Sequence, residues 1–388
     1  MTREALRILH QKLNFIGSIN RTYDDSFAKS GAKIGDSLKI RLPNEYTVRT
    51  GATLSAQDTT ESSTTLQIAT QKGVDLNFTS VDLTLSLDDF SKRILQPAMS
   101  VLAANIEADA LSMALDVYQN VNNLGSVLSF GKVMGARKVL NDALAPMDDS
   151  RSILLNTQDN ADLVDALKGL FQDSSAIKEQ YREGAMGRTG GYNFFENTLL
   201  TNQATGTAAA ATGYTVNGAV TANGSSSVVL AAGATTFKRG DIITFAGCNR
   251  VHPETKADTG ALQQFVVTAD YAGGAGTITV SPAIYTTTGR QNVVAAGIAN
   301  GVAVAKVGGA SAIYKPSLAF HKDAFAFATA DLVMPQGVDF SSRQVMDGIS
   351  LRIVRQYDIN NDKFPCRLDV LYGYKTIRAQ LACRILSN

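Results

Sequence analysis

Residues 237–247 have the sequence FKRGDIITFAG, which shows how the middle of the chain is organised. Arg239-Gly240-Asp241 has the composition of a turn, and the apolar residues after it predict a strand that ends at Gly247. Gly240 supplies the permissive backbone of the turn, and we expect the charges of Arg239 and Asp241 to face solvent or a neighbouring molecule. The same tripeptide serves integrin adhesion, but the N-terminal sequence MTREALRILHQKLNF lacks the apolar run of an export signal.

The composition changes abruptly around this stretch. Residues 197–237 contain no charged side chain and consist mainly of Ala, Thr, Gly, Ser and Asn. Short runs rich in β-branched and aromatic residues recur between turn pairs such as Asn-Gly and Gly-Gly, namely YTVNGAVT, SSVVLA, QQFVVTADY and GTITVSPAI. Regular short strands of this kind predict a small antiparallel barrel or sandwich over 212–310, inserted between segments of α/β texture.

The N-terminal third predicts three elements of different character. An amphipathic segment at helical spacing either docks on its own chain or lies as an arm on a neighbouring subunit; it contains Leu6, Leu9, Leu13 and Ile16. Between 35 and 87, DSLKIRL, TTLQIAT, VDLNF and VDLTLSL alternate with period two, which predicts antiparallel strands on a two-stranded excursion with an exposed polar tip. A long helix follows from Pro97 to Gln119, capped by Asp88-Asp89. Its apolar stripe comprises Leu102, Ile106, Ala110 and Met113, widened by Val101, Leu111 and Leu115.

Shorter elements flank the predicted module. We expect a helix over 130–146, a strand over 151–156 and a helix from 159 that is capped by Asp159 or Asn160. The chain then closes with two strands, ISLRIVRQYD (349–358) and CRLDVLYGYKTIRAQLACRIL (366–386). Between them, YDINND (357–362) is predicted to be a tight turn, with a calcium loop as the alternative.

Composition and motifs exclude several functions. Apolar residues make up 45% of the 388 residues, and Lys+Arg 36 nearly balances Asp+Glu 35, so the basic excess of a nucleic-acid-binding protein is missing. Three scattered cysteines, Cys248, Cys366 and Cys383, predict buried thiols rather than disulfides. The three histidines lie far apart in the sequence and indicate no metal site, and GKVMGARK (131–138) and GRTGGY (187–192) are interpreted as turns rather than phosphate loops. We expect no cofactor, no catalytic set and no membrane span.

The order of elements resembles that of the major capsid proteins of tailed bacteriophages, which have the Hong Kong 97-type fold. FKRGDIITFAG followed by FVVTADYAGGAGTITVSPAI is similar to the inserted domain of coat proteins from short-tailed enterobacterial phages. The closing CRLDVLYGYKTIRAQLACRI is similar to the end of the same family. The resemblance implies an α+β chain with N-arm, extended β-loop, spine helix, peripheral and axial domains, and an inserted small antiparallel β-barrel.

That resemblance also implies a domain division and partners. The expected parts are an N-terminal arm (1–34), an extended β-loop (35–87), the spine helix with the first part of the body (88–211), the inserted barrel (212–310) and the return to the axial and peripheral domains (311–388). The chain would assemble with itself as hexamers and pentamers of an icosahedral shell around the double-stranded DNA of a tailed phage. A separate scaffolding protein, a portal protein and non-specific DNA on the inner face are the other expected partners. Assembly would take place in the host bacterial cytoplasm, and the mature protein would reside in the virion.

The resemblance assigns charged side chains to subunit contacts. The loop would reach over an adjacent subunit with Lys39, Arg41, Glu45, Arg49 and Glu61. The inserted domain would touch neighbours through Lys238, Arg239 and Asp241, and a terminal hairpin would bring Arg378 and Arg384 to the axial contacts. Each could instead be an ordinary surface charge. Alternatives of other kinds are a bacterial nanocompartment shell with the same fold, a secreted β-rich adhesin and an enzyme. The sequence identifies no Lys–Asn pair for the covalent cross-linking known in some members of this fold.

Overall fold

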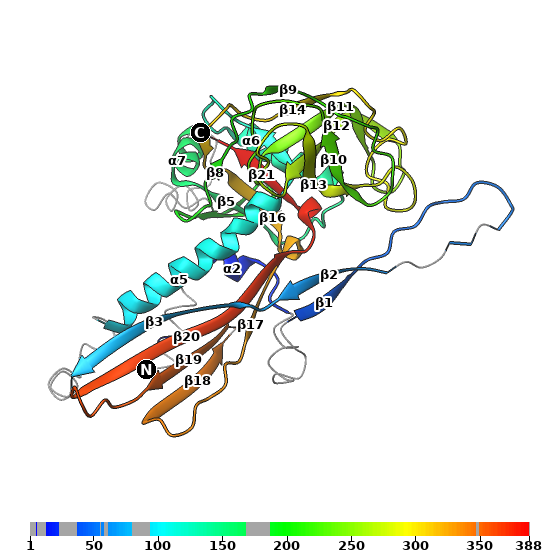
Figure 1. Cartoon of the computed structure of the whole chain (residues 1–388). Helices are drawn as coiled ribbons and strands as arrows, with labels where there is room; N and C mark the ends of the chain where they lie inside the picture. Colours follow the sequence, from blue (N-terminus) through cyan, green and yellow to red (C-terminus); the bar gives the residue numbers. More distant parts are fainter. Residues whose placement is uncertain are drawn as a thin grey trace. The chain divides into compact units, whose positions relative to one another are not determined.

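The computed structural model describes residue 5 and residues 13–22, 37–54, 56–57, 61–79, 94–167, 187–346 and 349–387. The chain is a mixed α+β protein with many strands and few helices (Figure 1). It divides into two compact units. The first unit comprises Met1–Ile40, Ser63–Met113 and Phe325–Ile377, and the second comprises Arg41–Ser62, Ala114–Ala324 and Arg378–Asn388.

The first unit is built on a five-stranded sheet around its longest strand, β20 (Lys363–Thr376). Strand β20 pairs antiparallel with β3 (Thr70–Thr79) on one side and with β19 (Ile349–Arg355) and β17 (Phe325–Ala330) on the other. Strand β18 (Phe340–Met346) pairs with β19 at the edge. The predicted strand VDLNF is therefore part of this sheet. VDLTLSL and the predicted cap Asp88-Asp89 lie outside the described residues.

The long helix of the first unit, α5 (Gln96–Leu111), begins with a proline in its first turn, as predicted. It continues only as a 3-10 turn over Ser112–Asp116, so the helical segment stops short of the predicted Gln119. The predicted stripe is buried, but Val101 is exposed and does not widen it. The segment Gln96–Asp116 is long and apolar enough to cross a membrane, yet 56% of its apolar window is buried in the protein. Burial of this kind is typical of the core helix of a folded domain.

The described part of the N-terminal segment docks on its own chain. Helix α2 (Asn14–Ser18) buries Phe15 and Ile16. The Phe15 ring meets Phe325 edge-on at 5.6 Å, and its backbone N–H donates to Glu107 of α5 at 2.6 Å. Of the two interpretations of the amphipathic segment, docking on its own core therefore holds for residues 13–20, while Leu6 and Leu9 lie outside the described residues.

Strands β1 (Ser37–Leu42) and β2 (Ser62–Gln67) form the predicted two-stranded sheet. In the first unit, Ile40, Leu66 and Ile68 pack against Ala326 and Ala328 of β17. The described residues between the two strands form neither helix nor strand. We call residues 43–61 the extended loop.

The second unit contains a six-stranded sheet in the order β4-β21-β16-β5-β7-β6. The strand bounds are β4 Asn120–Asn122, β21 Ala382–Leu386, β16 Ser317–His321, β5 Arg151–Leu155, β7 Tyr192–Glu196 and β6 Arg188–Thr189. Pairs β21–β4 and β5–β7 are parallel, and the other pairs are antiparallel. Strands β16 and β5 are buried along their whole length, which places them at the centre of this core.

Two helices accompany this sheet, as predicted. Helix α6 (Phe130–Asp142) packs on β4, β16 and β21, and α7 (Thr157–Leu167) packs on β5. The predicted cap of α7 is wrong, because Asn156 caps the helix: its Oδ1 accepts from Asp159 N at 2.7 Å, and its Nδ2 donates to the Asp159 carboxylate at 2.9 Å. GKVMGARK lies on α6 rather than in a turn. GRTGGY is the predicted turn, since Gly190 and Gly191, both at positive φ, join β6 to β7.

Six antiparallel strands between residues 211 and 306 form a nearly closed barrel-like sheet in the order β10-β13-β12-β11-β14-β9. The bounds are β9 Ala211–Thr215, β10 Ser225–Leu230, β11 Ile242–Val251, β12 Asp258–Val267, β13 Gly276–Ile284 and β14 Ala303–Lys306. A bridge between Val216 and Leu230 brings the two ends of the sheet together. The interior holds aromatic pairs such as Phe245 and Phe265, whose rings are 5.5 Å apart. The short pair β8 (Gln203–Ala204) and β15 (Ile313–Tyr314) joins the chain entering the barrel to the chain leaving it. We call this pair the neck.

Two predicted strand ends are wrong. Strand β11 does not stop at Gly247 but continues to Val251, because Gly247 adopts φ 76° in a bulge where the pairing with β12 shifts. The long terminal strand is split by a 3-10 turn at Ala379–Leu381, so that β20 belongs to the first unit and β21 to the second. Strands β19 and β20 pair as an antiparallel hairpin, but Arg378 and Arg384 lie beyond its end at Thr376. YDINND is a turn between β19 and β20, with Asp362 at positive φ.

Candidate assembly surface and barrel junction

The Arg-Gly-Asp turn has one buried and one exposed charge: Asp241 is buried and Arg239 is partly exposed. Gly240 has φ 95°, and a Cβ there would lie 3.1 Å from the Leu115 side chain. Asp241 is 0% exposed, and its Oδ2 accepts from the backbone N–H of Lys238 at 2.9 Å and of Gly206 at 3.0 Å. The prediction that Asp241 faces solvent or a neighbour is therefore wrong. Its carboxylate ties the turn to the chain beside the neck.

The other two charges of the turn are paired within the chain. Lys238 Nζ lies 2.7 Å from Asp270, and Arg239 Nη2 lies 2.7 Å from Asp116. The hydrogen bond from the Lys238 side chain and one from the Arg239 backbone hold the pKa of Asp270 below its ordinary value. Both cations remain partly exposed. They stay available at the surface, but each already has an anionic partner.

Arg384 is fully buried and comes from β21. Its guanidinium donates to Gln203 Oε1 at 2.8 Å and to the carbonyl of Gly240 at 2.9 Å. Burial lowers the pKa of Arg384 to about 10, against the opposing charge of Asp241. Arg384 therefore remains a cation at neutral pH, inside its own chain. A fully buried Arg384 does not fit its predicted role at the axial contacts between subunits.

A second buried cation approaches the same carboxylate. Lys306 donates to the carbonyls of Gly309 at 2.9 Å and Gly206 at 3.2 Å. Burial lowers the pKa of Lys306, and the charge of Asp241 opposes that shift. One buried anion is thus held between two buried cations. We call Gln203, Gly206, Gly240, Asp241, Lys306 and Arg384 the junction cluster.

Two further polar contacts join the barrel to the sheet-and-helix part of the second unit. Gln264 of β12 accepts from Asn120 N at 2.7 Å and donates to Asn120 O at 3.2 Å, which makes a two-way contact with β4. Arg250 of β11 reaches Asp142 of α6 at 2.5 Å, where Lys138 also binds at 3.1 Å. Burial alone would raise the pKa of Asp142, but hydrogen bonds from Lys138 and Arg250 lower it. The barrel is therefore fixed by side chains from several strands.

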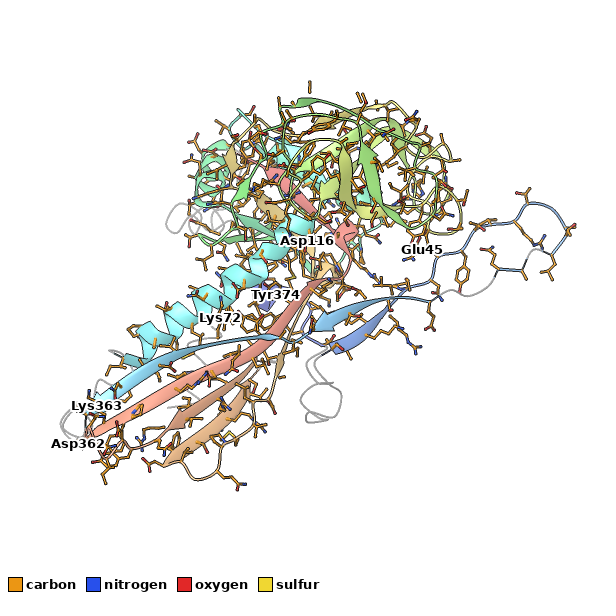
Figure 2. The ribbon with its side chains drawn as sticks, viewed as in Figure 1. Glu45, Lys72, Asp116, Asp362, Lys363 and Tyr374 are labelled. Atoms are coloured by element: carbon orange, nitrogen blue, oxygen red, sulfur yellow. The ribbon has the colours of Figure 1, made fainter. Side chains whose placement is uncertain are left out.

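The extended loop carries three of the predicted contact residues, Glu45, Arg49 and Glu61, and all three are exposed. Arg41 reaches Glu61 across the loop at 3.3 Å, and Arg49 donates to the carbonyl of Gly51. Apolar side chains are also exposed here, namely Tyr46, Leu54 and Val48, the last with 94% of its surface accessible. Figure 2 shows the side chains of this loop standing out from an irregular backbone. Lys39 is exposed on β1, and Arg378 is half-buried beside the 3-10 turn.

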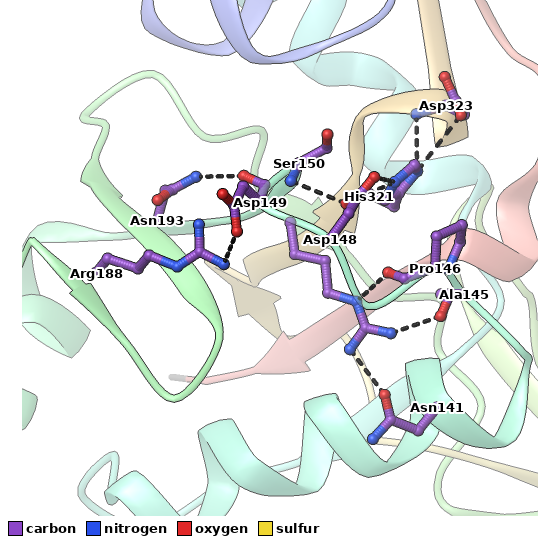
Figure 3. A network of polar contacts seen from close by, with 11 residues as sticks. Asn141, Ala145, Pro146, Asp148, Asp149, Ser150, Arg188, Asn193, His321 and Asp323 are labelled. Atoms are coloured by element: carbon purple, nitrogen blue, oxygen red, sulfur yellow. Dashed lines mark hydrogen bonds and ion pairs between the residues drawn. The ribbon is translucent and has the colours of Figure 1, made fainter.

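A separate network of charges surrounds the start of β5 (Figure 3). Arg151 donates to the carbonyls of Ala145 and Pro146 and to Asn141 Oδ1 at 2.6 to 2.8 Å. Buried His321 lies 3.2 Å from Asp148, and its Nδ1 accepts from Asp323 N at 3.3 Å. These contacts fix the turn before β5. In the described parts of the chain, no three His, Cys, Asp or Glu side chains are arranged to hold a metal ion.

The family model described as P22 coat protein, gene protein 5, matches residues 18–384. The chain belongs to the P22 coat protein family. As a member of this family it is a phage major capsid protein, a structural component that forms the shell of the virion and not an enzyme.

One solved structure bears out the Hong Kong 97-type fold. A structure from Mycobacterium phage Che8 is similar over 95% of this chain and 89% of that chain, with TM-score 0.50 and 15% identity. The bacteriophage PhiM1 mature capsid (TM-score 0.46, 9% identity, 92% and 83% covered) and the capsid of Ralstonia phage GP4 (0.44, 8%, 91% and 84%) are also similar. No curated protein matches the sequence significantly.

Proposed function

We propose that this coat protein assembles as hexamers and pentamers into an icosahedral shell that encloses the double-stranded DNA of a tailed phage. Family membership supports the proposal, and the exposed extended loop is the observation that carries it. A net charge of +1 suits a wall of like subunits that pack side by side and meet DNA without binding it tightly. A separate scaffolding protein and a portal protein complete the proposed set of partners.

The same proposal assigns parts to the chain. We propose an arm (1–34), a β-loop (35–87), a spine with the first part of the body (88–211), an inserted barrel (212–310) and a return to the body (311–388). The barrel-like sheet between residues 211 and 306 and the neck that joins its ends support the limits of the insertion.

We propose that the extended loop is covered by a neighbouring subunit. Exposed Tyr46, Val48 and Leu54 give this irregular segment an apolar surface, and a second copy of the chain would cover it. Charged contacts would come from Lys39, Arg41, Glu45, Arg49 and Glu61 around it. Lys238, Arg239 and Arg378 would serve at other contacts. For Asp241 and Arg384 we propose an internal role instead, because both are buried.

The test is expression of the protein alone and together with a candidate scaffolding protein, followed by sedimentation and negative-stain microscopy. Val48→Asp should leave thermal unfolding of the free subunit unchanged and should abolish or strongly reduce shells. Val48→Thr, of nearly the same shape, is the matched control and should assemble. Normal shells from Val48→Asp would contradict the loop as an interface, and a strictly monomeric wild-type protein under both conditions would contradict the assembly proposal. The family match favours this function over a nanocompartment shell.

A further inference from the structure

The extended loop touches the barrel of its own chain at one glycine. A Cβ at Gly289 would lie 2.5 Å from the carbonyl carbon of Glu45 and 2.9 Å from Tyr46 N, and it would overlap the Glu45 carbonyl oxygen. Gly289 is not among the glycines at positive φ, so its own backbone conformation would accept other residues. The close approach of the loop is what requires glycine here. Figure 2 shows Glu45 at this end of the loop.

Lys256 holds the barrel surface that receives the loop. Its Nζ donates to the carbonyls of Pro253 and Gly289 at 2.5 Å each and of Gln291 at 3.4 Å. The side chain is half-buried, and burial lowers the pKa of Lys256 while the charge of Glu45 opposes that shift. One ammonium thus joins two barrel turns directly beneath the loop. The backbone φ of Lys256 is 58°, a left-handed conformation that is unusual for a lysine.

Two contacts link the two sides of the loop, one beyond Glu45 and one before it. Gln57 accepts from Thr47 N at 2.9 Å and from Thr47 Oγ1 at 3.0 Å, and it donates to Thr47 O at 2.6 Å. Arg41 and Glu61 form a second rung nearer the strands. The contact at Glu45 therefore restricts the loop backbone as far as Thr47, which is bonded to Gln57. Thr47 directly precedes the exposed Val48.

We propose that the barrel is the seat that sets the direction of the extended loop of its own subunit, through the contact of Gly289 with Glu45 and Tyr46 and the carbonyl clamp of Lys256. A free irregular loop adopts many conformations, and binding by a neighbour costs conformational entropy because only one of them is kept. A loop that is already held against the barrel loses less entropy on binding, so association between subunits is faster and favours one subunit geometry. This consequence for assembly depends on the proposed role of the loop as an interface. The seat itself does not.

The test compares two variants with a matched glycine control in the free subunit. Gly289→Ala introduces the overlap, and Lys256→Met removes the clamp while keeping a long side chain. Gly276→Ala is the control, because this barrel glycine also lacks a positive φ and its added Cβ would meet Tyr271 no closer than 3.4 Å. Hydrogen exchange over residues 43–54 and the rate of tryptic cleavage after Arg49 report the freedom of the loop.

Gly289→Ala and Lys256→Met should each accelerate loop exchange and cleavage after Arg49 by about fivefold, while amides of β11 and β12 keep their protection and Gly276→Ala changes neither. Unchanged loop rates in both variants would overturn the proposal. If Gly289→Ala unfolds the barrel, Lys256→Met decides alone. Assembly is measured separately: a freed loop with normal shells leaves the seat intact but contradicts the loop as an interface, whereas a seated loop that fails to assemble after Val48→Asp supports it.

Discussion

Arg384 is a buried cation without contact to solvent. Its contribution to the stability of the fold therefore depends on its partners within the chain. The guanidinium binds Gln203 of the neck and Gly240 of the Arg-Gly-Asp turn, while Asp241 supplies the nearby negative charge. Removing one member of a buried charge group leaves the others unpaired, which costs more than the pair contributes. This residue therefore couples strand β21 to the neck and to the start of β11.

Replacing Arg384 by Met should lower the free energy of unfolding of the second unit by about 3 kcal/mol, since Asp241 loses one of its two neighbouring cations and two acceptors lose their donor. Urea unfolding followed by circular dichroism measures the change. Arg384→Lys keeps the charge but loses the guanidinium that donates to two acceptors at once. Its stability should lie between those of the wild type and Arg384→Met. In the double variant with Asp241→Asn the costs should be less than additive. Additive costs would show that the two charges do not interact.

At the scale of elements, a polar clamp holds helix α5 on the sheet of the first unit. Asp109 of α5 accepts from Tyr372 of β20 and pairs with Lys72 of β3 at 2.6 Å. Burial and the neighbouring carboxylate raise the pKa of Tyr372, so its hydroxyl stays protonated and donates. The helix is thus fixed in register to two strands by directional bonds as well as by apolar packing.

Tyr372→Phe should lower the free energy of unfolding of the first unit by about 2 kcal/mol, the usual contribution of a hydrogen bond to a charged group. Hydrogen exchange of α5 and β20 amides locates the loss. Tyr374→Phe is the control on the same strand, because the hydroxyl of Tyr374 has no hydrogen-bond partner among the described residues. Equal effects from both substitutions would show that the hydrogen bond from the Tyr372 hydroxyl to Asp109 contributes nothing specific, which would contradict the clamp.

At the scale of the whole molecule, several aspartates with shifted pKa values make the stability of the fold depend on pH. Burial alone would raise the pKa of Asp369, but Arg352 and Arg367, each 2.8 Å away, outweigh it and lower the pKa below its ordinary value. Hydrogen bonds likewise lower the pKa of Asp142, Asp148 and Asp270. Burial raises the pKa of Asp159, which works in the opposite direction.

Carboxylates with lowered pKa stabilise the fold above their unfolded pKa of about 4, and this contribution is lost as pH falls through the folded pKa. Stability should therefore be flat near neutrality and should decline below about pH 4. Asp369→Asn should lower stability at pH 7 and flatten the acid decline, as measured by urea unfolding at several pH values. Glu254→Gln, at an exposed position, should change neither. An unchanged acid profile in Asp369→Asn would contradict this assignment.

Local patterns in the sequence predicted most elements of the fold but not the partners of its charges. Alternating Leu38 and Ile40 and the stripe of Leu102 and Ile106 encode burial directly, so strand β1 and helix α5 were predictable. Pairing between distant strands cannot be inferred from local sequence. VDLNF was therefore assigned to the two-stranded excursion, although it lies in β3 and pairs with β20. The break between β20 and β21 was missed for the same reason. An apolar run has the same pattern whether it fills one sheet or two.

The candidate contact residues show the same limit. Arg384 and Asp241 were selected as charges, and charge usually indicates surface. Their burial depends on partners more than a hundred positions away in the sequence, such as Gly240 for Arg384. A local signal did exist for Asp241, since an Asp that closes a turn commonly accepts from a backbone N–H within it, as it does here from Lys238. The exposed loop charges were easier to predict because the surrounding sequence is polar.

The place of β21 has a consequence for the order of biosynthesis. This strand lies between β16 and β4, yet the ribosome makes it only after the whole of 325–377, which belongs to the first unit. Until then both neighbouring strands keep an unpaired edge, the kind of surface that recruits other chains. A chain without residues 382–386 would leave β4 and the facing edge of β16 unpaired. Synthesis of β21 is therefore the step that joins β4 to the rest of this sheet and covers the open edge of β16.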